Sequence, residues 1–369
     1  MLHVKNLFKI LVKKKVNFFT GVPDSILKSL SKILEKKNKK NHIVATNEGS
    51  AISIGIGYHL ATNKIPCVYL QNSGIGNALN PLISIAHRKV YSVPMLLLIG
   101  WRGSPKFKDE PQHKVKGAIT KKLLHLMNIK YLLLKNENDL KKLGKIIDKS
   151  KKSNTPVACL IQKNTLIYKK ENNVKNLISN KCKREEVINC LLTTIKKNTN
   201  IVSTTGFTSR ELMQIRSAKN LKIGKDFYMV GGMGHAAMVA LGASLFTTKQ
   251  VVCLDGDGSL LMHMGSLNTV GFLANKNFKH ILLNNNSHES VGGQVTNAEK
   301  INFDKLTKSL GYKKYFLIKQ KKELNKKISS FINSNGPSFL EIKIARGSLS
   351  KLIRPDDLKK IKKQFMLSF

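Results

Sequence analysis

Two short motifs hold the residue types that could bind a metal ion together with a phosphate group. The first, Gly256-Asp257-Gly258-Ser259, follows the apolar run Val251–Asp255, and the second, Asn284-Asn285, follows the apolar run His280–Leu283. Backbone N–H groups at a glycine-flanked turn that opens a helix can approach a phosphate closely. Carboxylate and amide oxygens are ligands that Mg²⁺ prefers, and phosphate oxygens complete its octahedron. The two motifs therefore predict a site for Mg²⁺ and a phosphate group.

The chain between these motifs must bring them to one place. The interval from Asp257 to Asn285 has room for one helix, which we expect at Leu260–Leu273, and for one neighbouring strand. The carboxyl ends of parallel strands lie along the same edge of a sheet, and ligands bind there. We therefore expect Asp257 and Asn285 to meet at such an edge.

Short apolar runs alternate with longer helical patterns along almost the whole chain. This alternation is typical of α/β proteins with doubly wound parallel sheets. The other predicted helices include Glu48–Leu60, Asn77–Ile85 and His235–Leu245. The predicted strands are Ile43–Thr46, Cys67–Gln71, Met95–Gly100, Pro156–Gln162, Ile201–Ser203, Val251–Asp255, His280–Asn284 and Phe339–Ile344.

The length of 369 residues suggests two domains, because a domain has about 150 residues. The polar, lysine-rich segment 171–183 is the predicted linker between domains 1–170 and 184–369.

No apolar run approaches the roughly 20 residues that cross a bilayer, so we expect no membrane helix. At the N-terminus, Val4, Leu7 and Leu11 fall at helical spacing. We expect them to form the first helix of the fold, not a targeting peptide.

The formal net charge of +42 raises the question of nucleic-acid binding. Only seven of the 64 basic residues are arginines, and the lysines are scattered through every segment. Such scatter indicates a uniformly lysine-rich surface, so we expect no specific nucleic acid and no membrane as partner. The positive field should still attract anionic substrates. The five cysteines show no C-x-x-C spacing, which predicts neither zinc nor disulfides and favours the cytoplasm.

The GDG and NN motifs, at this spacing, resemble the diphosphate motif of thiamine diphosphate enzymes. The resemblance implies that Asp257, Asn285 and the carbonyl of Ser287 hold Mg²⁺. It also implies that Gly256, Gly258 and Ser259 adjoin the diphosphate. Asn286 stands where a glycine commonly follows, and asparagine is the next residue type to tolerate positive φ.

Three further segments are consistent with this resemblance. Glu48 matches the glutamate that hydrogen-bonds the pyrimidine N1′, although a glutamate that opens a helix can simply be a favourable first-turn charge. Met233, between Gly232 and Gly234, matches the bulky residue beneath the cofactor, although it could equally be a core methionine. Asn72, in the loop Gln71–Asn77, is a further candidate cofactor contact. The glycines of this loop could also indicate a dinucleotide-binding site, but they are weak evidence for one.

The chain as a whole resembles the phosphonopyruvate decarboxylases, with the sulfopyruvate decarboxylases as close relatives. Like them it has no room for a middle domain. The resemblance implies non-oxidative decarboxylation of 3-phosphonopyruvate to phosphonoacetaldehyde and CO₂ in phosphonate biosynthesis, or of 3-sulfopyruvate. It also implies a homodimer or larger homo-oligomer with the active site at the subunit interface. The segments that carry it are Gly21–Ser25, Gln71–Asn80, Gly100–Gly103, Asp109–His113, Thr205–Arg210, Met262–Gly265 and His288–Gln294.

A decarboxylase of this kind needs an acid that protonates the product carbon. Asp24, His113 and His288 are the candidates, and the sequence does not rank them; each could also be a surface or capping residue. His263 is expected to pack within its helix.

The substrate's oxyanion needs donors, and Ser25, Arg102 and Arg354 are the candidates. Either arginine could instead form a structural ion pair. A nucleic-acid-binding protein on a decayed enzyme scaffold is the competing class of function. Intact Glu48, Asp257 and Asn285 argue against such decay.

Overall fold

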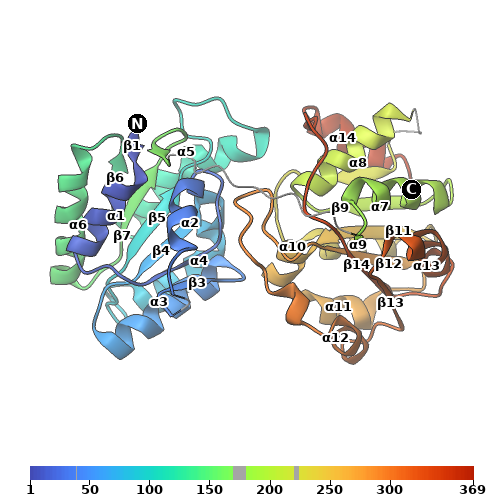
Figure 1. Cartoon of the computed structure of the whole chain (residues 1–369), viewed down its shortest axis with the longest axis horizontal. Helices are drawn as coiled ribbons and strands as arrows, with labels where there is room; N and C mark the ends of the chain where they lie inside the picture. Colours follow the sequence, from blue (N-terminus) through green and yellow to red (C-terminus); the bar gives the residue numbers. More distant parts are fainter. Residues whose placement is uncertain (39, 169–179, 220–223) are drawn as a thin grey trace. The chain divides into compact units, whose positions relative to one another are not determined.

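The computed structural model describes residues 1–38, 40–168, 180–219 and 224–369 (Figure 1). They form two compact units: residues up to 168 with 291–294, and the other described residues from 180 onward. Most of the predicted linker 171–183 lies outside the described residues. Cys182, near its end, is buried and forms a parallel bridge with Ile344, so this end belongs to the second unit.

The first unit is built on a six-stranded sheet in which every neighbouring pair is parallel. The strand order is β3-β2-β4-β5-β7-β6. These strands are β2 (Phe19–Gly21), β3 (His42–Val44), β4 (Cys67–Gln71), β5 (Leu96–Gly100), β6 (Lys130–Leu134) and β7 (Val157–Ile161). A separate two-stranded sheet pairs β1 (Leu2–His3) with β8 (Leu166–Ile167).

The second unit repeats this topology with a parallel sheet of order β10-β9-β11-β12-β14-β13. When the six strands of each sheet are counted along the chain, both sheets read 2-1-3-4-6-5. The strands are β9 (Asn200–Ser203), β10 (Asp226–Tyr228), β11 (Val251–Gly256), β12 (Phe278–Asn284), β13 (Lys314–Ile318) and β14 (Ser338–Lys343). The predicted α/β class with two doubly wound sheets is confirmed.

Helices cover both faces of the first sheet because successive strand residues point to opposite sides. Cys67 and Tyr69 of β4 pack in one apolar cluster, and Val68 and Leu70 pack in another. The first cluster contains residues of α1 (Val4–Lys13), α2 (Lys28–Leu34) and α6 (Asp139–Ser153). The second contains residues of α3 (Glu48–Thr62), α4 (Ile75–Pro81) and α5 (Pro111–Leu126).

The second sheet is covered in the same way. One cluster joins the sheet to α7 (Arg184–Thr194), α8 (Phe207–Ala218) and α13 (Leu324–Ile332). The other joins it to α9 (Ala236–Leu245), α10 (Asp257–Met262), α11 (Ser266–Leu273), α12 (Phe303–Ser309) and α14 (Leu358–Met366). Among the described residues, no helix combines the length and the apolar character needed to cross a lipid bilayer.

The structure corrects one predicted helix. The segment Leu260–Leu273 is two helices, α10 and α11, with a break at His263, whose backbone leaves the helical region at φ −135° and ψ 48°. His263 therefore does not pack within a helix as expected; its ring stacks on His235 at 4.6 Å. The first helix is confirmed as α1, which buries Val4, Leu7 and Leu11.

This topology determines where polar groups can gather. In a 2-1-3-4 arrangement the chain direction across the sheet reverses between the first and third strands, and a crevice opens beyond their carboxyl ends. That reversal falls between β2 and β4 in the first unit and between β9 and β11 in the second. In the first unit, Asp24 lies in the loop after β2, and Gln71 is the last residue of β4. In the second unit, Asp257 directly follows β11.

Two helical glycines of the second unit give a matched test of its packing. A Cβ atom at Gly271 in α11 would lie 1.7 Å from the carbonyl oxygen of Leu310, whereas one at Gly242 in α9 would meet nothing within 4 Å. We expect Gly271→Ala to destabilise the protein by about 1–3 kcal/mol, as overpacking does. Gly242→Ala should stabilise it by about 0.5–1 kcal/mol, because alanine loses less backbone entropy. Urea unfolding of both variants measures this; equal effects would contradict the packing of α11.

Candidate active site

In the first unit, Asp24 is a fully buried carboxyl group at the end of β2. Its Oδ1 accepts a hydrogen bond from Gln71 Nε2 at 2.6 Å, and its Oδ2 accepts from the backbone N–H groups of Ile26 and Leu27. Burial raises the pKa of Asp24 above its ordinary value, and these hydrogen bonds only partly oppose the shift. The carboxyl group is thus poised to hold a proton at a higher pH than an exposed aspartate.

Glu48 is the first residue of α3 and is also buried. Asn47 caps the helix, and the Glu48 Oε2 accepts a hydrogen bond from Asn77 Nδ2 at 2.7 Å. A Cβ atom at Gly74 would lie 2.2 Å from Glu48 Oε1, so this carboxylate can occupy its place only beside a glycine. The loop Gln71–Asn77 therefore contributes both the space and the donor that orient Glu48.

Asn72 uses its side chain to join the ends of two neighbouring strands. Its Nδ2 donates to the Arg102 carbonyl and to Thr120 Oγ1, and its Oδ1 accepts from the Arg102 backbone N–H. Both amide hydrogens are engaged by the protein. The side chain thereby holds the loop after β4 against the loop after β5.

Arg102 forms the ion pair that the sequence left open as an alternative. Its Nε donates to Asp109 Oδ2 at 2.8 Å and its Nη2 to Oδ1 at 2.5 Å, while Nη1 donates to Ser25 Oγ at 3.2 Å. The bidentate pair lowers the pKa of Asp109, although burial opposes this. Arg354 is exposed and precedes α14 in the second unit.

His113 lies in the first turn of α5. Its Nδ1 is buried, and none of the residues that the structure describes forms a hydrogen bond with it. Burial, together with the nearby Arg102 charge, lowers the pKa of His113 to about 4. His113 is therefore a neutral imidazole at pH 7.

In the second unit, Asp257 and Asn285 meet as predicted. The backbone N–H of Ser287 lies 3.0 Å from Asp257 Oδ2 and 3.0 Å from Asn285 Oδ1. Asn286, at φ 53°, makes the turn from Asn285 to Ser287 in the left-handed region, as its residue type allows. The Thr296 hydroxyl also donates to Asp257 Oδ2, at 2.5 Å.

The electrostatics of this cluster favour a cation. Asp257 is 3% exposed, and none of the described residues gives it a cationic partner. Burial raises its pKa to about 6. The nearby Ser287 Oγ is buried and has no hydrogen-bond partner among the described residues. A cluster of hard oxygen atoms with an unbalanced buried charge suits a divalent metal ion.

Three separate segments converge beside this cluster. A Cβ atom at Gly258 would lie 2.7 Å from His288 Nδ1 and 3.4 Å from Met233 Cε, so only a glycine fits between these side chains. Ser259 Oγ accepts a hydrogen bond from the backbone N–H of Gly234, whose φ of 90° requires glycine. Burial lowers the pKa of His288 to about 4. The structure thus brings the GGMG, GDG and NN segments together.

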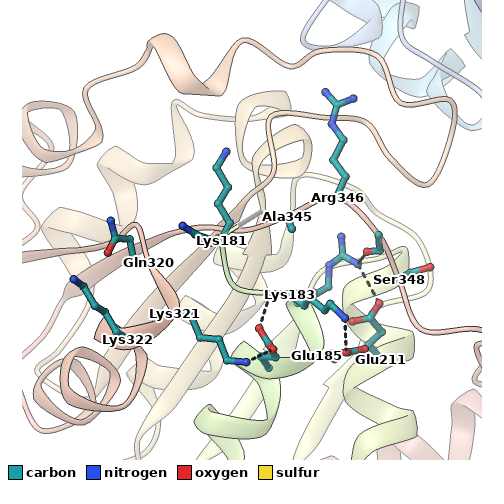
Figure 2. A pocket seen from close by; sticks show the side chains of 14 residues that line it. Lys181, Lys183, Glu185, Glu211, Gln320, Lys321, Lys322, Ala345, Arg346 and Ser348 are labelled. Atoms are coloured by element: carbon teal, nitrogen blue, oxygen red, sulfur yellow. Dashed lines mark hydrogen bonds and ion pairs between the residues drawn. The ribbon is translucent and has the colours of Figure 1, made fainter. Parts of the chain in front are cut away.

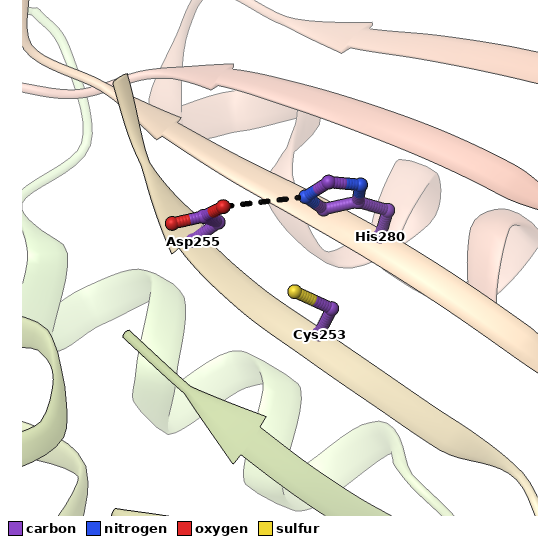
Figure 3. Close-up of side chains that lie close together, drawn as sticks. All are labelled: Cys253, Asp255 and His280. Atoms are coloured by element: carbon purple, nitrogen blue, oxygen red, sulfur yellow. Dashed lines mark ion pairs between the residues drawn. The ribbon is translucent and has the colours of Figure 1, made fainter. Parts of the chain in front are cut away.

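A second polar cluster lies within the strands that carry this site. Figure 3 shows Cys253, Asp255 and His280, all buried, on the neighbouring strands β11 and β12. The His280 Nε2 is 3.7 Å from Asp255 Oδ2 and has no hydrogen bond within the described part of the chain, while Nδ1 pairs with the hydroxyl of Tyr312 at 2.9 Å. Sequence reasoning assigned these residues to an apolar strand core and missed the cluster.

Comparison with known proteins identifies the class of protein. Residues 3–124 match the family model of the N-terminal TPP binding domain of thiamine pyrophosphate enzymes, and residues 205–342 match the model of the C-terminal TPP binding domain. The two matches fall in the two units, one in each. The chain is therefore a thiamine pyrophosphate enzyme.

Comparison with individual proteins shows which thiamine pyrophosphate enzymes the chain is similar to. The chain is 32% identical to the phosphonopyruvate decarboxylase of Streptomyces viridochromogenes, over 92% of this chain and 88% of that protein. It is 31% identical to the one from Streptomyces hygroscopicus, over 92% and 87%. The sulfopyruvate decarboxylase of Methanosarcina acetivorans is 27% identical, over 79% of this chain and 78% of that protein. The chain belongs to the phosphonopyruvate decarboxylase family and is a carboxy-lyase.

The raised pKa of Asp257 predicts a cost in stability for the protein without metal. In the unfolded chain this carboxyl titrates near 3.8, and in the folded protein near 6, so stability should fall as the pH rises from about 4 to 6. The penalty should be on the order of 1–3 kcal/mol. Asp257→Asn removes the charge and should raise the unfolding temperature at pH 8, with little effect at pH 4. Thermal unfolding in chelator tests this; equal midpoints at pH 8 would refute it.

Proposed function

We propose that this chain catalyses the non-oxidative decarboxylation of 3-phosphonopyruvate to phosphonoacetaldehyde and CO₂, using thiamine diphosphate and Mg²⁺, in phosphonate biosynthesis. The observation that carries the proposal is the meeting of Asp257 and Asn285 at one backbone N–H, with a buried charge that no described cation balances. The near full-length similarity to two phosphonopyruvate decarboxylases supports the substrate.

The residues of the second unit fit the diphosphate end of the cofactor. Asp257, Asn285 and the Ser287 carbonyl would hold Mg²⁺, which would supply positive charge to stabilise the diphosphate. The orphaned Ser287 hydroxyl and the unbalanced Asp257 charge are consistent with this role. The residues that would adjoin the cofactor are Gly232, Met233, Gly234, Gly256, Gly258 and Ser259, with Asn72 supporting the loop of the first unit.

Bound thiamine diphosphate supplies the electron sink that accepts the electrons of the breaking C–C bond. Glu48 would hydrogen-bond the pyrimidine N1′ and exchange a proton there. Its fixed position between Asn77 and Gly74 supports this role, because a carboxylate that shares a proton must be held in one geometry.

Among the three candidate acids, we place Asp24 first as the group that protonates the product carbon. Burial raises its pKa, which favours the protonated form that a general acid needs. His113 and His288 both have pKa values of about 4, so they are neutral at pH 7 and can donate a proton only weakly. These two histidines would instead shape the site.

The phosphonate group would bind near Arg102 and Ser25, which already contact each other. Asp109 occupies the guanidinium fork, so an oxyanion must compete with this carboxylate for Arg102. A doubly charged phosphonate competes better than a singly charged sulfonate. Arg354 would add a further positive charge. The alternative substrate, 3-sulfopyruvate, is supported by the sulfopyruvate decarboxylases among the relatives.

We further propose that the protein is a homodimer or larger homo-oligomer, with each active site formed at a subunit interface. Sulfopyruvate decarboxylases of methanogens include relatives named as separate alpha and beta subunits, which match 37% and 35% of this chain. In the second unit, α9 and α11 pack together, and the large side chains exposed on or beside them include Phe246 (89%), Phe272 (74%) and Leu273 (56%). Such a patch is typical of a protein–protein interface.

The proposed function is tested by supplying both oxo acids to the purified protein with thiamine diphosphate and Mg²⁺, and measuring the aldehyde product. We expect a higher kcat/KM for 3-phosphonopyruvate, because the Arg102 region must capture a dianion. Asp257→Ala should show no turnover with either acid. A preference for 3-sulfopyruvate would establish the alternative substrate, and no aldehyde from either acid would overturn the proposal.

The role of Glu48 can be separated from cofactor binding. Glu48→Gln keeps the size and a hydrogen bond but cannot exchange a proton in the same way. Turnover should fall by roughly 10²–10⁴, the usual contribution of general acid–base catalysis. Cofactor affinity, measured by calorimetry, should change only a few-fold, because Mg²⁺ and the diphosphate provide most of the binding. Near-normal turnover in this variant would show that Glu48 is not the activating carboxylate.

A further inference from the structure

Glu289 lies next to the candidate metal ligands and contacts one of them directly. Its Oε2 accepts a hydrogen bond from Asn285 Nδ2 at 2.9 Å and another from Arg184 Nη2 at 2.7 Å. Its Oε1 accepts from the backbone N–H of Gly347. Glu289 is therefore held by two other segments while it holds the amide of Asn285.

Arg184, the first residue of α7, is the fixed support of this arrangement. Its side chain is 6% exposed, and its Nη1 donates to Glu211 Oε1 at 3.1 Å and to the Gly347 carbonyl at 2.9 Å. The guanidinium also lies over the ring of Phe207, 5.6 Å from its centroid. With two carboxylates and a ring around it, the Arg184 fork has little freedom to move.

These contacts continue into a pocket of about 850 Å³ in the second unit, whose lining includes Arg184, Glu211 and Gly347. Figure 2 shows Glu211 and Lys321 among the side chains that line it. The Nζ of Lys321 pairs with Glu186 Oε1 at 2.7 Å. The Glu186–Lys321 pair does not contact the Asn284–His288 loop by any described hydrogen bond. It therefore offers a matched control for Glu289.

The amide of Asn285 has two different ends, and only one suits a cation. The Oδ1 end faces the Ser287 N–H that it shares with Asp257, and the Nδ2 end faces Glu289. If the amide turned over, its NH₂ group would point toward the metal position, and its oxygen would face the Glu289 carboxylate. A carboxylate that accepts from Nδ2 excludes that orientation.

We propose that Glu289 is a positioning residue for the metal: it fixes the Asn285 amide with its carbonyl oxygen toward Mg²⁺, and Arg184 holds Glu289 in place. This inference rests on the proposed role of Asn285 as a Mg²⁺ ligand. Partners that orient a ligating side chain typically contribute 10–100-fold in metal affinity. Sequence reasoning gave no signal for this role, because Glu289 is a polar loop residue far along the chain from Arg184.

The first test measures Mg²⁺ binding without turnover. Calorimetric titration with Mg²⁺ at a fixed thiamine diphosphate concentration should give a dissociation constant about 10–100-fold higher for Glu289→Gln than for the unmodified protein. Glu186→Gln removes a more exposed ion pair that lines the same pocket, and it should leave the constant unchanged. An equal constant for Glu289→Gln and the unmodified protein would overturn the proposal.

A double variant separates orientation from general damage to the loop. Aspartate at position 285 presents two equivalent oxygens, so it needs no fixed orientation, and glutamine at 289 can donate to it. Glu289→Gln/Asn285→Asp should therefore recover most of the Mg²⁺ affinity lost in Glu289→Gln alone. No recovery, with unfolding temperatures that match, would mean that Glu289 acts only as a structural support.

Asp257→Ala distinguishes failure of this inference from failure of the proposed function. If Asp257→Ala loses Mg²⁺ binding while Glu289→Gln does not, the metal site is correct and the positioning role is wrong. If Asp257→Ala binds Mg²⁺ normally, the assigned metal site itself is wrong.

Discussion

The burial of the Asp257 carboxylate is the constraint on which the candidate site depends. A buried charge is costly unless something balances it, and the described residues offer this one hydrogen bonds but no cation. The fold therefore retains a group that is unfavourable in the protein alone and that a bound divalent ion would stabilise. The nearby glycines allow the segments to pack this closely, because a side chain at Gly258 would clash with His288 and one at Gly234 would clash with His263.

The same topology in both units explains why polar groups gather where they do. In each sheet the chain adds strands first toward one edge and then, from the third strand on, toward the other edge. The buried Asp24 and the buried Asp257 each lie beyond the strand ends at this switch point in their own unit. Asp24 is held by Gln71 and by backbone N–H groups, whereas Asp257 is held by Thr296 and Ser287. Asp24 follows the first strand of its sheet and Asp257 follows the third strand of the other, so the two buried carboxyl groups lie at different strand ends of one topology and have different partners.

Sequence reasoning located the strands whose apolar residues are continuous, and it placed Asp257 beside Asn285 because parallel strands share an edge. It missed β6 and β13, which are edge strands whose apolar residues are flanked by lysines. It also missed the short strands β1, β2, β8 and β10. It also extended a helix through His263, since the apolar period continues there while the backbone breaks to let His263 pack against Gly234. Contacts such as Glu289 with Arg184 join residues far apart in the chain, and no local pattern records them.

The few arginines show which contacts a lysine could not replace. In a chain with 64 basic residues and only seven arginines, Arg102, Arg184 and Arg216 are each engaged by carboxylates in two or more hydrogen bonds. A lysine ammonium is a point charge and cannot reproduce this planar fork. Two of the three lie beside loops that the candidate site uses: Arg102 beside Ser25, and Arg184 behind Glu289 and Asn285. At these three positions the direction of the hydrogen bonds fixes neighbouring carboxylates, which a lysine could not do with the same geometry.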